Sequence, residues 1–532
     1  MLRLTEVKLP IDHPGGELQA AILRRLGITA DDLVGYSVFR RAVDARKRPA
    51  IAFIYTLDIE VKHEPALLQR LEGDRHVTRA PDTSYRFVAQ APASLAARPV
   101  VIGAGPCGLF SGLLLAQMGF RPIILERGKA VRERTRDTWG LWRKSVLNPE
   151  SNVQFGEGGA GTFSDGKLYS QVKDPRHLGR KVLTEFAKAG APLEILYVAK
   201  PHIGTFRLVG MVENLRDTIH GLGGEIRFGA KVSDMEIEQE QVRGVVLAGG
   251  ERIAADHVVL AVGHSARDTF QMLHDRGVHI EAKSFSIGLR IEHPQSLIDR
   301  ARYGKNAGHP LLGAADYKLV HHCGNGRSVY SFCMCPGGTV VAATSEPGRV
   351  VTNGMSQYSR NERNANSGIV VGITPADYPG HPLAGIAFQR KWEARAYELG
   401  GGDYHAPAQR VGDFLAGRPS TAPGTVAPSY APGVRMTDLG ACLPDYAVEA
   451  IREALPAFEK RIKGYAMDDA VLTGVETRTS SPVNIKRNQE YESVNTRGLY
   501  PAGEGAGYAG GILSAAIDGI EVAEAVARSM LR

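Results

Sequence analysis

The chain has 532 residues, of which 43% are hydrophobic and 23% are charged. This length allows roughly two to four domains with a substantial core, and the composition excludes a fibrous or disordered protein. The net charge of +7 comes from 64 basic and 57 acidic residues spread along the chain, which indicates a mild preference for anionic ligands.

Cysteine usage and hydropathy indicate the compartment. Five cysteines do not make a disulfide framework, and they fit a reducing environment. No secretion signal opens the chain, and no stretch of about 18 apolar residues is present. We therefore expect a soluble, cytoplasmic protein without a membrane partner.

Residues 1–95 are predicted to form a small α+β domain of the βαββ type. Residues 16–28 have helical spacing, whereas 36–43 and 50–61 have the pattern of two strands joined by a basic hairpin. The basic residues are Arg40, Arg41, Arg46, Lys47 and Arg48. They lack interleaved aromatic residues, so a solvated hairpin is favoured over a nucleic-acid site. Residues 89–99 are the predicted linker to the next domain.

Residues 99–128 have the pattern of a dinucleotide-binding βαβ unit. An apolar strand at 100–102 is followed by Gly103, Gly105 and Gly108 at G-x-G-x-x-G spacing, where a helix begins. The first glycine permits the tight turn, the second lets a pyrophosphate approach, and the third lets the helix pack closely on the strand. Glu126 ends the second strand, where a carboxylate can bind a ribose diol.

Residues 155–169 contain five glycines, which exclude a regular helix or strand. Close backbone approach to a flat or phosphorylated ligand is predicted, with Thr162 and Ser164 as hydrogen-bond donors. A flexible loop is the alternative, but the apolar residues Phe155, Phe163 and Leu168 favour packing.

An apolar run at 257–262 is predicted to return the chain to the parallel sheet. It stops at Gly263, which places the following residues at the carboxyl end of a strand, where doubly wound sheets bind ligands. His264 at this position is either a flavin neighbour or a turn residue. Residues 276–490 have mixed strands and helices without further dinucleotide signals, as expected of a substrate domain.

Cys333 and Cys335 are two residues apart, so a regular strand would project both thiols from one face. They are either small buried hydrophobic residues or a redox or ligand-lining pair beside the cofactor. A metal site with His321, His322 and Cys323 is the least favoured interpretation, because the spacing matches no usual zinc pattern, and no metal is predicted.

The chain ends in a strand at 499–504 and an amphipathic helix at 512–530, separated by glycines. In flavoproteins with a similar arrangement, the N-terminus of such a helix, here at Gly511 and Ile512, would direct its partial positive charge toward the flavin edge that becomes negative on reduction.

With these elements in order, the chain resembles flavoproteins of the glutathione-reductase and para-hydroxybenzoate-hydroxylase type, and most of all the bacterial family of uncharacterised FAD-dependent dehydrogenases. The resemblance is carried by VIGAGPCGL, GEGGAGTFSDGKL, KPHIGT, AVGHSARDT, SFCMCPGG, EPGRVVTNGMS, GVETRTSSPV and LYPAGEGAGYAGGI. It implies FAD as the cofactor.

The resemblance also implies roles for individual residues. The pyrophosphate would lie at Gly103, Gly105, Pro106 and Gly108. Glu126 would bind the adenosine ribose, and the Val232 backbone the adenine. The ribityl chain and the isoalloxazine would be surrounded by Gly159, Gly161, Thr162, Phe163, Gly503, Glu504, Gly511 and Ile512. Arg127 and Gly263 complete the predicted cofactor set.

The predicted fold class is α/β. A doubly wound, discontinuous Rossmann-like FAD-binding domain is expected at 96–275 and 491–532, with an inserted mixed α+β substrate domain at 276–490 and the α+β domain at 1–95.

The predicted function is FAD-dependent hydride transfer between a small-molecule substrate and flavin N5. Cys333 and Cys335 are the candidate catalytic residues, and Arg290 and Lys318 are candidate anion-binding residues. A second G-x-G-x-x-G unit is not found, so NAD(P)H would bind only transiently as electron donor. The alternatives are a flavin-dependent monooxygenase or oxidase and, in another class, an FAD-containing binding or regulatory protein without turnover. The sequence does not predict the substrate or the oligomeric state.

Overall fold

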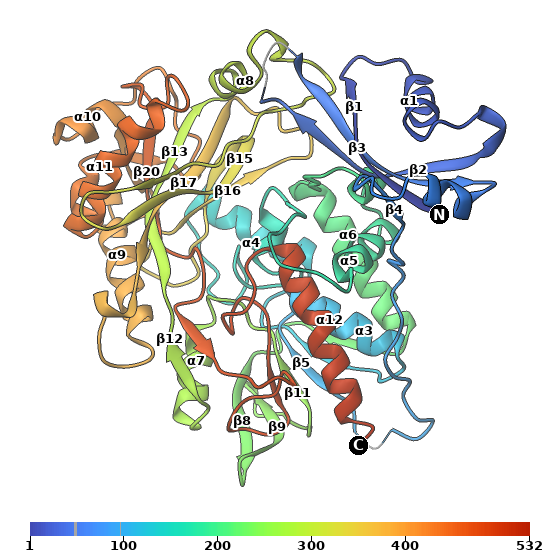
Figure 1. The fold of residues 1–532 in the computed structure, drawn as a ribbon. Coiled ribbons are helices and arrows are strands. Elements are labelled where there is room, and N and C mark those ends of the chain that lie inside the picture. Colours follow the sequence, from blue (N-terminus) through green and yellow to red (C-terminus); the bar gives the residue numbers. More distant parts are fainter. Residues whose placement is uncertain (47–49, 96) are drawn as a thin grey trace.

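The computed structural model of the chain describes residues 1–46, 50–95 and 97–532, built around three large sheets (Figure 1). Lys47 and Arg48 of the predicted basic hairpin lie outside the described residues. Of the other hairpin residues, Arg46 pairs with Asp44, and the Arg41 guanidinium lies over the Phe53 ring.

The N-terminal part is a four-stranded antiparallel sheet in the order β2-β3-β1-β4. Its elements are β1 (Leu2–Pro10), α1 (Glu17–Leu26), β2 (Leu33–Asp44), β3 (Ala52–Val61), α2 (Glu64–Arg70) and β4 (Val77–Arg79). Alternate residues of β3 are buried, among them Leu57 and Ile59, and Ile22 of α1 belongs to the same core. The helix and the two strands predicted from the sequence are therefore present.

A five-stranded parallel sheet in the order β22-β11-β5-β6-β7 forms the centre of the molecule. Its strands are β5 (Val100–Ile102), β6 (Ile123–Leu125), β7 (Glu225–Arg227), β11 (Val258–Leu260) and β22 (Leu499–Pro501). The strands are in register, with Val101 opposite both Ile124 and Val259, so their carboxyl ends lie level at one edge. The sequence predicts a parallel sheet that the last strand of the chain completes. The parallel pairing of β22 with β11 confirms this prediction.

The two faces of this sheet are covered differently. One face packs against α3 (Pro106–Gln117), α5 (Leu178–Lys188), α6 (Thr205–Gly221) and α12 (Ile512–Ser529). The other packs against a three-stranded antiparallel sheet, β8 (Val232–Glu238), β9 (Gln241–Leu247) and β10 (Arg252–Ala254), and against α7 (Arg267–Asp275). Doubly wound sheets carry helices on both faces, so this small sheet is a difference from the expected architecture.

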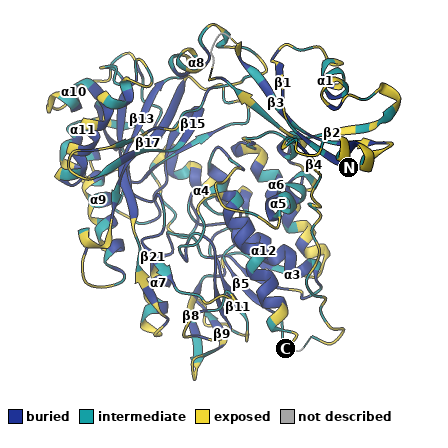
Figure 2. Ribbon diagram, in the orientation of Figure 1, coloured by how far each residue is buried: buried dark blue, intermediate teal, exposed yellow. Residues whose placement is uncertain are grey.

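An eight-stranded sheet lies above the parallel sheet in Figure 1. Its strands are β13 (Phe285–Pro294), β14 (Val320–His322), β15 (Ser328–Ala342), β16 (Thr352–Ser356), β17 (Asn364–Ile373), β18 (Ala406–Arg410), β19 (Val434–Met436) and β20 (Val471–Glu476). Its helices are α8 (Gln295–Tyr303), α9 (Ala384–Gly400), α10 (Val411–Ala416) and α11 (Asp445–Glu459). The central strands β13, β17 and β20 are buried on both faces because the helices cover the outer face, and Figure 2 shows β13 and β17 mostly dark blue.

Further elements connect these parts. They are α4 (Val131–Lys144) and the two-stranded sheet β12 (Ile280–Ala282) with β21 (Val483–Ile485). The short 3-10 helices are η1 (Ala30–Asp32), η3 (Ala160–Phe163), η4 (Leu193–Leu196), η5 (Gly304–Asn306), η6 (Pro375–Asp377) and η7 (Leu439–Ala441). Among the described residues, no helix has the length and apolar character needed to cross a bilayer.

Candidate functional site

A cavity of about 430 Å³ lies where the carboxyl ends of β5, β6, β11 and β22 face β15 and β16 of the large sheet. It is lined by most of the residues that the sequence analysis singled out: Gly103, Gly105, Pro106, Glu126, Arg127, Gly159, Gly161, Val232, Gly263, Cys333, Gly503, Glu504, Gly511 and Ile512. Segments from the first and the last part of the nucleotide fold and from the large sheet thus meet around one space.

Six predicted site residues are not among the lining residues: Gly108, Thr162, Phe163, Arg290, Lys318 and Cys335. The Thr162 hydroxyl is buried and donates to the Glu157 carbonyl, and the Phe163 ring packs edge-on against Trp142. Lys318 is exposed and does not line the cavity.

The geometry of the turn between β5 and α3 explains why glycines stand at three of its positions. Gly103 has a φ of +101°, and a Cβ there would lie 2.3 Å from the Ala261 carbonyl oxygen. A Cβ on Gly108 would lie 1.8 Å from the Gly103 carbonyl oxygen, so α3 could not pack on the turn. A Cβ on Gly105 would meet only the Gly159 Cα, at 3.7 Å. The first and third glycines are therefore required by the fold, whereas space remains at the second, beside the free N–H groups of α3.

Glu126 lies at the end of β6 and is buried. One carboxylate oxygen accepts the Ala104 N–H at 2.8 Å, and the other accepts the N–H groups of Gly128 and Gly156, both at 2.9 Å. The side chain therefore joins the first glycine turn to the second glycine-rich loop while it lines the cavity.

Arg134 of α4 holds the second glycine-rich loop and was missed in the sequence. Its side chain is fully buried, and it donates to the carbonyls of Asn152, Val153 and Glu157, each at 2.7 Å. Burial lowers the pKa of its guanidinium to about 10. In the sequence it is one of several arginines on a basic helix, and nothing local distinguishes it from its exposed neighbours.

Glu504 and the N-terminus of α12 form another part of the cavity wall. Burial raises the pKa of Glu504 to about 7, although the nearby Lys283 ammonium lowers it. A Cβ on Gly511 would meet no atom within 4 Å, so the first turn of α12 faces open space. The Gly503 N–H donates to Asp518, which also pairs with Arg487 at 2.6 Å.

We predict that Glu504 makes stability depend on pH. Its carboxyl ionises near 4.5 in the unfolded chain and near 7 in the folded one, so the folded state binds more protons between these values. The free energy of unfolding of the apoprotein should therefore fall by about 3 kcal/mol as the pH rises through this window. Urea unfolding of the wild type and of Glu504→Gln over this range tests it. An equal slope in the two proteins would contradict the assignment.

The part of the cavity next to the large sheet is built on an irregular strand. The pairing of β15 with β17 shifts register on both sides of Cys335, and Cys333 has a φ of +43°. The expected regular strand is therefore wrong, because a β-bulge interrupts the pleat, although the two thiols still lie next to each other. Cys333 is partly exposed and lines the cavity, whereas Cys335 is fully buried.

Arg290 lies behind these cysteines and is fully buried. Its guanidinium donates to the Cys333 carbonyl at 2.6 Å, to Asn366 at 2.9 Å and to Glu476 at 3.0 Å. It therefore supports the bulge from the protein side and does not line the cavity.

Three charged or titratable groups of the lining complete the site. Lys167, missed in the sequence, donates to the Met334 carbonyl and lies 3.4 Å from Asp165. His264 lines the cavity, and burial together with the cations Arg478 and Arg267 lowers its pKa to about 3, so its ring is neutral. The buried Arg478 donates to Ser345 at 2.6 Å.

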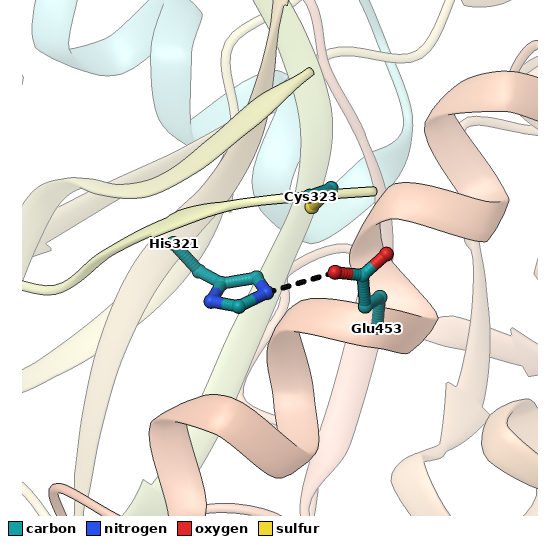
Figure 3. Close-up of side chains that lie close together, drawn as sticks. All are labelled: His321, Cys323 and Glu453. Carbon is teal, nitrogen blue, oxygen red and sulfur yellow. Dashed lines mark hydrogen bonds and ion pairs between the residues drawn. The ribbon is translucent and has the colours of Figure 1, made fainter. Parts of the chain in front are cut away.

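His321, Cys323 and Glu453 are brought together outside this cavity (Figure 3). One ligand atom from each lies within 4.8 Å of the others, although no metal was expected from the sequence. The His321 imidazole pairs with Glu453 at 3.0 Å, and the Gly324 N–H also donates to that carboxylate. These bonds attach the turn after β14 to α11.

Comparisons with known proteins identify the family. Residues 284–479 match the C-terminal domain-like family of FAD-dependent proteins, and residues 1–60 match a domain of unknown function. An uncharacterized protein of Clostridium beijerinckii is 48% identical over 525 residues, which cover 98% of each chain. The chain belongs to this family of uncharacterised FAD-dependent proteins.

Solved structures of flavoproteins are similar to this FAD-dependent protein at low sequence identity. Glycine oxidase from Geobacillus kaustophilus has a TM-score of 0.35 and 13% identity, over 82% of this chain and 95% of that chain. Glycerol-3-phosphate dehydrogenase from Bacillus halodurans, complexed with FAD, has a TM-score of 0.36 and 13% identity, over 83% of this chain and 66% of that chain.

The residues of the cavity fit FAD. Open space at Gly105, Gly263 and Gly511 leaves room for a ligand beside the backbone, as the diphosphate and the flavin require. The buried carboxylate of Glu126 lies at the end of β6, where a ribose diol donates in dinucleotide folds. The volume of the cavity lies in the range of cofactor pockets.

We predict that Glu126→Gln weakens FAD binding by about 10- to 100-fold. The carboxamide nitrogen cannot accept, so at least one of the three backbone N–H groups loses its partner, and the negative charge toward the ribose is lost. Titration of the apoprotein with FAD, followed by flavin fluorescence, measures the change. Glu225→Gln, at the half-exposed end of the sheet, is the control and should bind FAD as the wild type does. Equal affinities of Glu126→Gln and the control would contradict the assignment.

Proposed function

We propose that this protein is an FAD-dependent oxidoreductase that binds a small-molecule substrate between the large sheet and the flavin. The observation that carries the proposal is the continuity of the cavity. It extends from Glu126 and Val232, next to the predicted adenosine, to Cys333 and Asn353 of the large sheet. A cofactor that reaches from the nucleotide fold would therefore present its reactive end to residues of the other sheet.

The proposed cofactor contacts follow the geometry. The pyrophosphate would lie at Gly103, Gly105 and Pro106, at the N-terminus of α3. The flavin would lie between the second glycine-rich loop and Gly511, where α12 begins. When bound, FAD supplies the transfer of a hydride or of electrons.

The protein's own groups prepare this environment. The N-terminus of α12 provides a positive potential where negative charge develops on reduction. The neutral His264 and the buried Glu504 line the cavity, and the low polarity around buried groups strengthens these interactions. We propose that Cys333 and Cys335 act at the substrate side, supported by Arg290. Lys167, rather than the exposed Lys318, is the cation that would meet an anionic substrate.

The number of nucleotide folds indicates how NAD(P)H would bind to the protein. Within the described residues a single five-stranded parallel sheet is present, and it forms the proposed FAD site. NAD(P)H, if it is the donor, would therefore bind transiently over the flavin rather than in a domain of its own.

The visible spectrum of the purified protein under nitrogen tests this function. A yellow protein that bleaches with NADH or NADPH would be a reductase or monooxygenase. Bleaching by neither, but by a candidate substrate, would indicate a dehydrogenase or oxidase. A colourless protein that takes up no FAD would overturn the proposal.

A further inference from the structure

The two cysteines at the substrate side of the cavity differ in access although they lie next to each other. Cys333 lines the cavity, and Cys335 is fully buried behind it. The Cys335 thiol donates to the Cys333 carbonyl oxygen at 3.3 Å, and its sulfur lies beside that of Cys333. The bulge in β15 thus places one accessible and one inaccessible sulfur side by side.

Among the described residues, the ion pairs around these two cysteines leave one positive charge in excess. Arg290 is balanced by Glu476, with 3.0 Å between them, and it lies 3.6 Å from the Cys335 sulfur. On the other side, Lys167 and Arg360 share a single carboxylate, that of Asp165. The surplus charge lies beside the peptide that joins the two cysteines, because Lys167 donates to the Met334 carbonyl.

This electrostatic arrangement distinguishes the two thiols. The adjacent Cys335 thiol, together with Lys167 and Arg290, holds the pKa of Cys333 well below its ordinary value. The adjacent Cys333 and burial raise the pKa of Cys335 well above its ordinary value. An accessible thiolate beside a buried thiol is the arrangement of an attacking cysteine with a resolving one.

We propose that Cys333 and Cys335 form a thiol–disulfide exchange centre, and that the substrate of the cavity is a small disulfide or the corresponding thiol. The proposal rests on the proposed function for the source of electrons. The Cys333 thiolate bonds to one sulfur of the external disulfide, whose own S–S bond breaks, and the other sulfur leaves as a thiolate.

The second step closes the cycle on the protein. Cys335 gives its proton to the departing thiolate and attacks the Cys333 sulfur, so that the remaining half of the substrate leaves and takes a proton from water. The external disulfide is reduced to two thiols, and the cysteine pair is oxidised to a disulfide. Its return to the Cys333 thiolate and the Cys335 thiol takes two electrons and one proton, which a reduced flavin bound in the same cavity would supply.

The first test uses reduced, native wild-type protein, as purified and after removal of flavin, with glutathione disulfide as the probe. The expected result is loss of two hydrogen masses from the chain, release of two equivalents of glutathione, and a disulfide that maps to Cys333 and Cys335. Modification of Cys107, Cys323 or Cys442 in place of this pair would overturn the proposal, as would no reaction.

Variants separate the two roles. Cys335→Ser should stop at a mixed disulfide that carries one glutathionyl group on Cys333, whereas Cys333→Ser should not react. Lys167→Met should slow the first step about tenfold, because the surplus charge is lost. Cys323→Ser, outside the cavity, is the matched control and should behave as the wild type does. A Cys335→Ser protein without an adduct on Cys333 would refute the assignment of roles.

The outcome is separable from that of the proposed function, since the flavin spectrum of each protein is recorded alongside its mass. A yellow protein that its nucleotide or substrate bleaches, but whose cysteines do not exchange, would keep the oxidoreductase and refute the exchange centre. Exchange in a protein that takes up no FAD would keep the exchange centre and refute the oxidoreductase.

Discussion

Replacement of Gly105 by alanine is expected to give a folded protein that has lost its FAD, whereas Gly108→Ala should destabilise the fold itself. The Gly105 backbone has a φ of −77°, which any residue adopts, and its Cβ would enter the space that we assign to the pyrophosphate. The Gly108 Cβ would overlap the Gly103 carbonyl and force α3 away from β5. We expect a loss of FAD affinity of at least about tenfold for the first variant, and of about 3 kcal/mol of stability for the second.

The absorbance ratio of flavin to protein, together with urea unfolding of the apoproteins, separates the two effects. Gly210→Ala is the control, because Gly210 lies within α6 and its Cβ would meet no atom within 4 Å. It should bind FAD normally and gain a little stability, since alanine favours a helix. Retention of wild-type FAD affinity by Gly105→Ala would place the pyrophosphate elsewhere.

The second large effect is expected at Arg134. Its replacement by methionine leaves the carbonyls of Asn152, Val153 and Glu157 without their donors inside the protein. We expect a loss of about 3–5 kcal/mol in the free energy of unfolding. FAD should also be lost, because Gly156, next to these carbonyls, donates its N–H to Glu126.

Denaturant unfolding and flavin content measure both consequences of Arg134→Met. The matched control is Arg132→Met on the same helix, where the side chain is 73% exposed and forms an ion pair with Glu213. Surface pairs of this kind contribute little, so the control should remain close to the wild type. If the two variants lost the same stability, the buried hydrogen bonds of Arg134 would not be what holds the loop.

The sequence predicts the nucleotide fold well because its signals are local. The strand at 100–102, the glycine turn and the acidic residue at 126 lie close together in the sequence. The structure contains each of them. The N-terminal strands and helix were predicted for the same reason, since alternation and helical spacing are visible in short windows.

The remaining site depends on contacts that no local pattern encodes. Lys167 reaches the Met334 carbonyl from a loop far away in the chain, and Arg134 is buried only because the second glycine-rich loop folds over it. The bulge at Cys333 depends on how β15 pairs with β17. The antiparallel sheet on the second face of the parallel sheet could not be predicted either, because short strands do not show which surface they cover.

The order in which the sheet is completed has a consequence for biosynthesis. The edge strand β22 and the helix α12 belong to the nucleotide fold, yet the ribosome makes them only after the whole large sheet. Until then, the surface of α3 that later receives α12, through contacts such as that of Ser111 with Gly519, stays uncovered on the nascent chain. The wall formed by Glu504 and Gly511 is also absent at that stage. We therefore expect flavin loading to be a late event, and chains that stop before β22 should accumulate without cofactor and with an uncovered apolar surface.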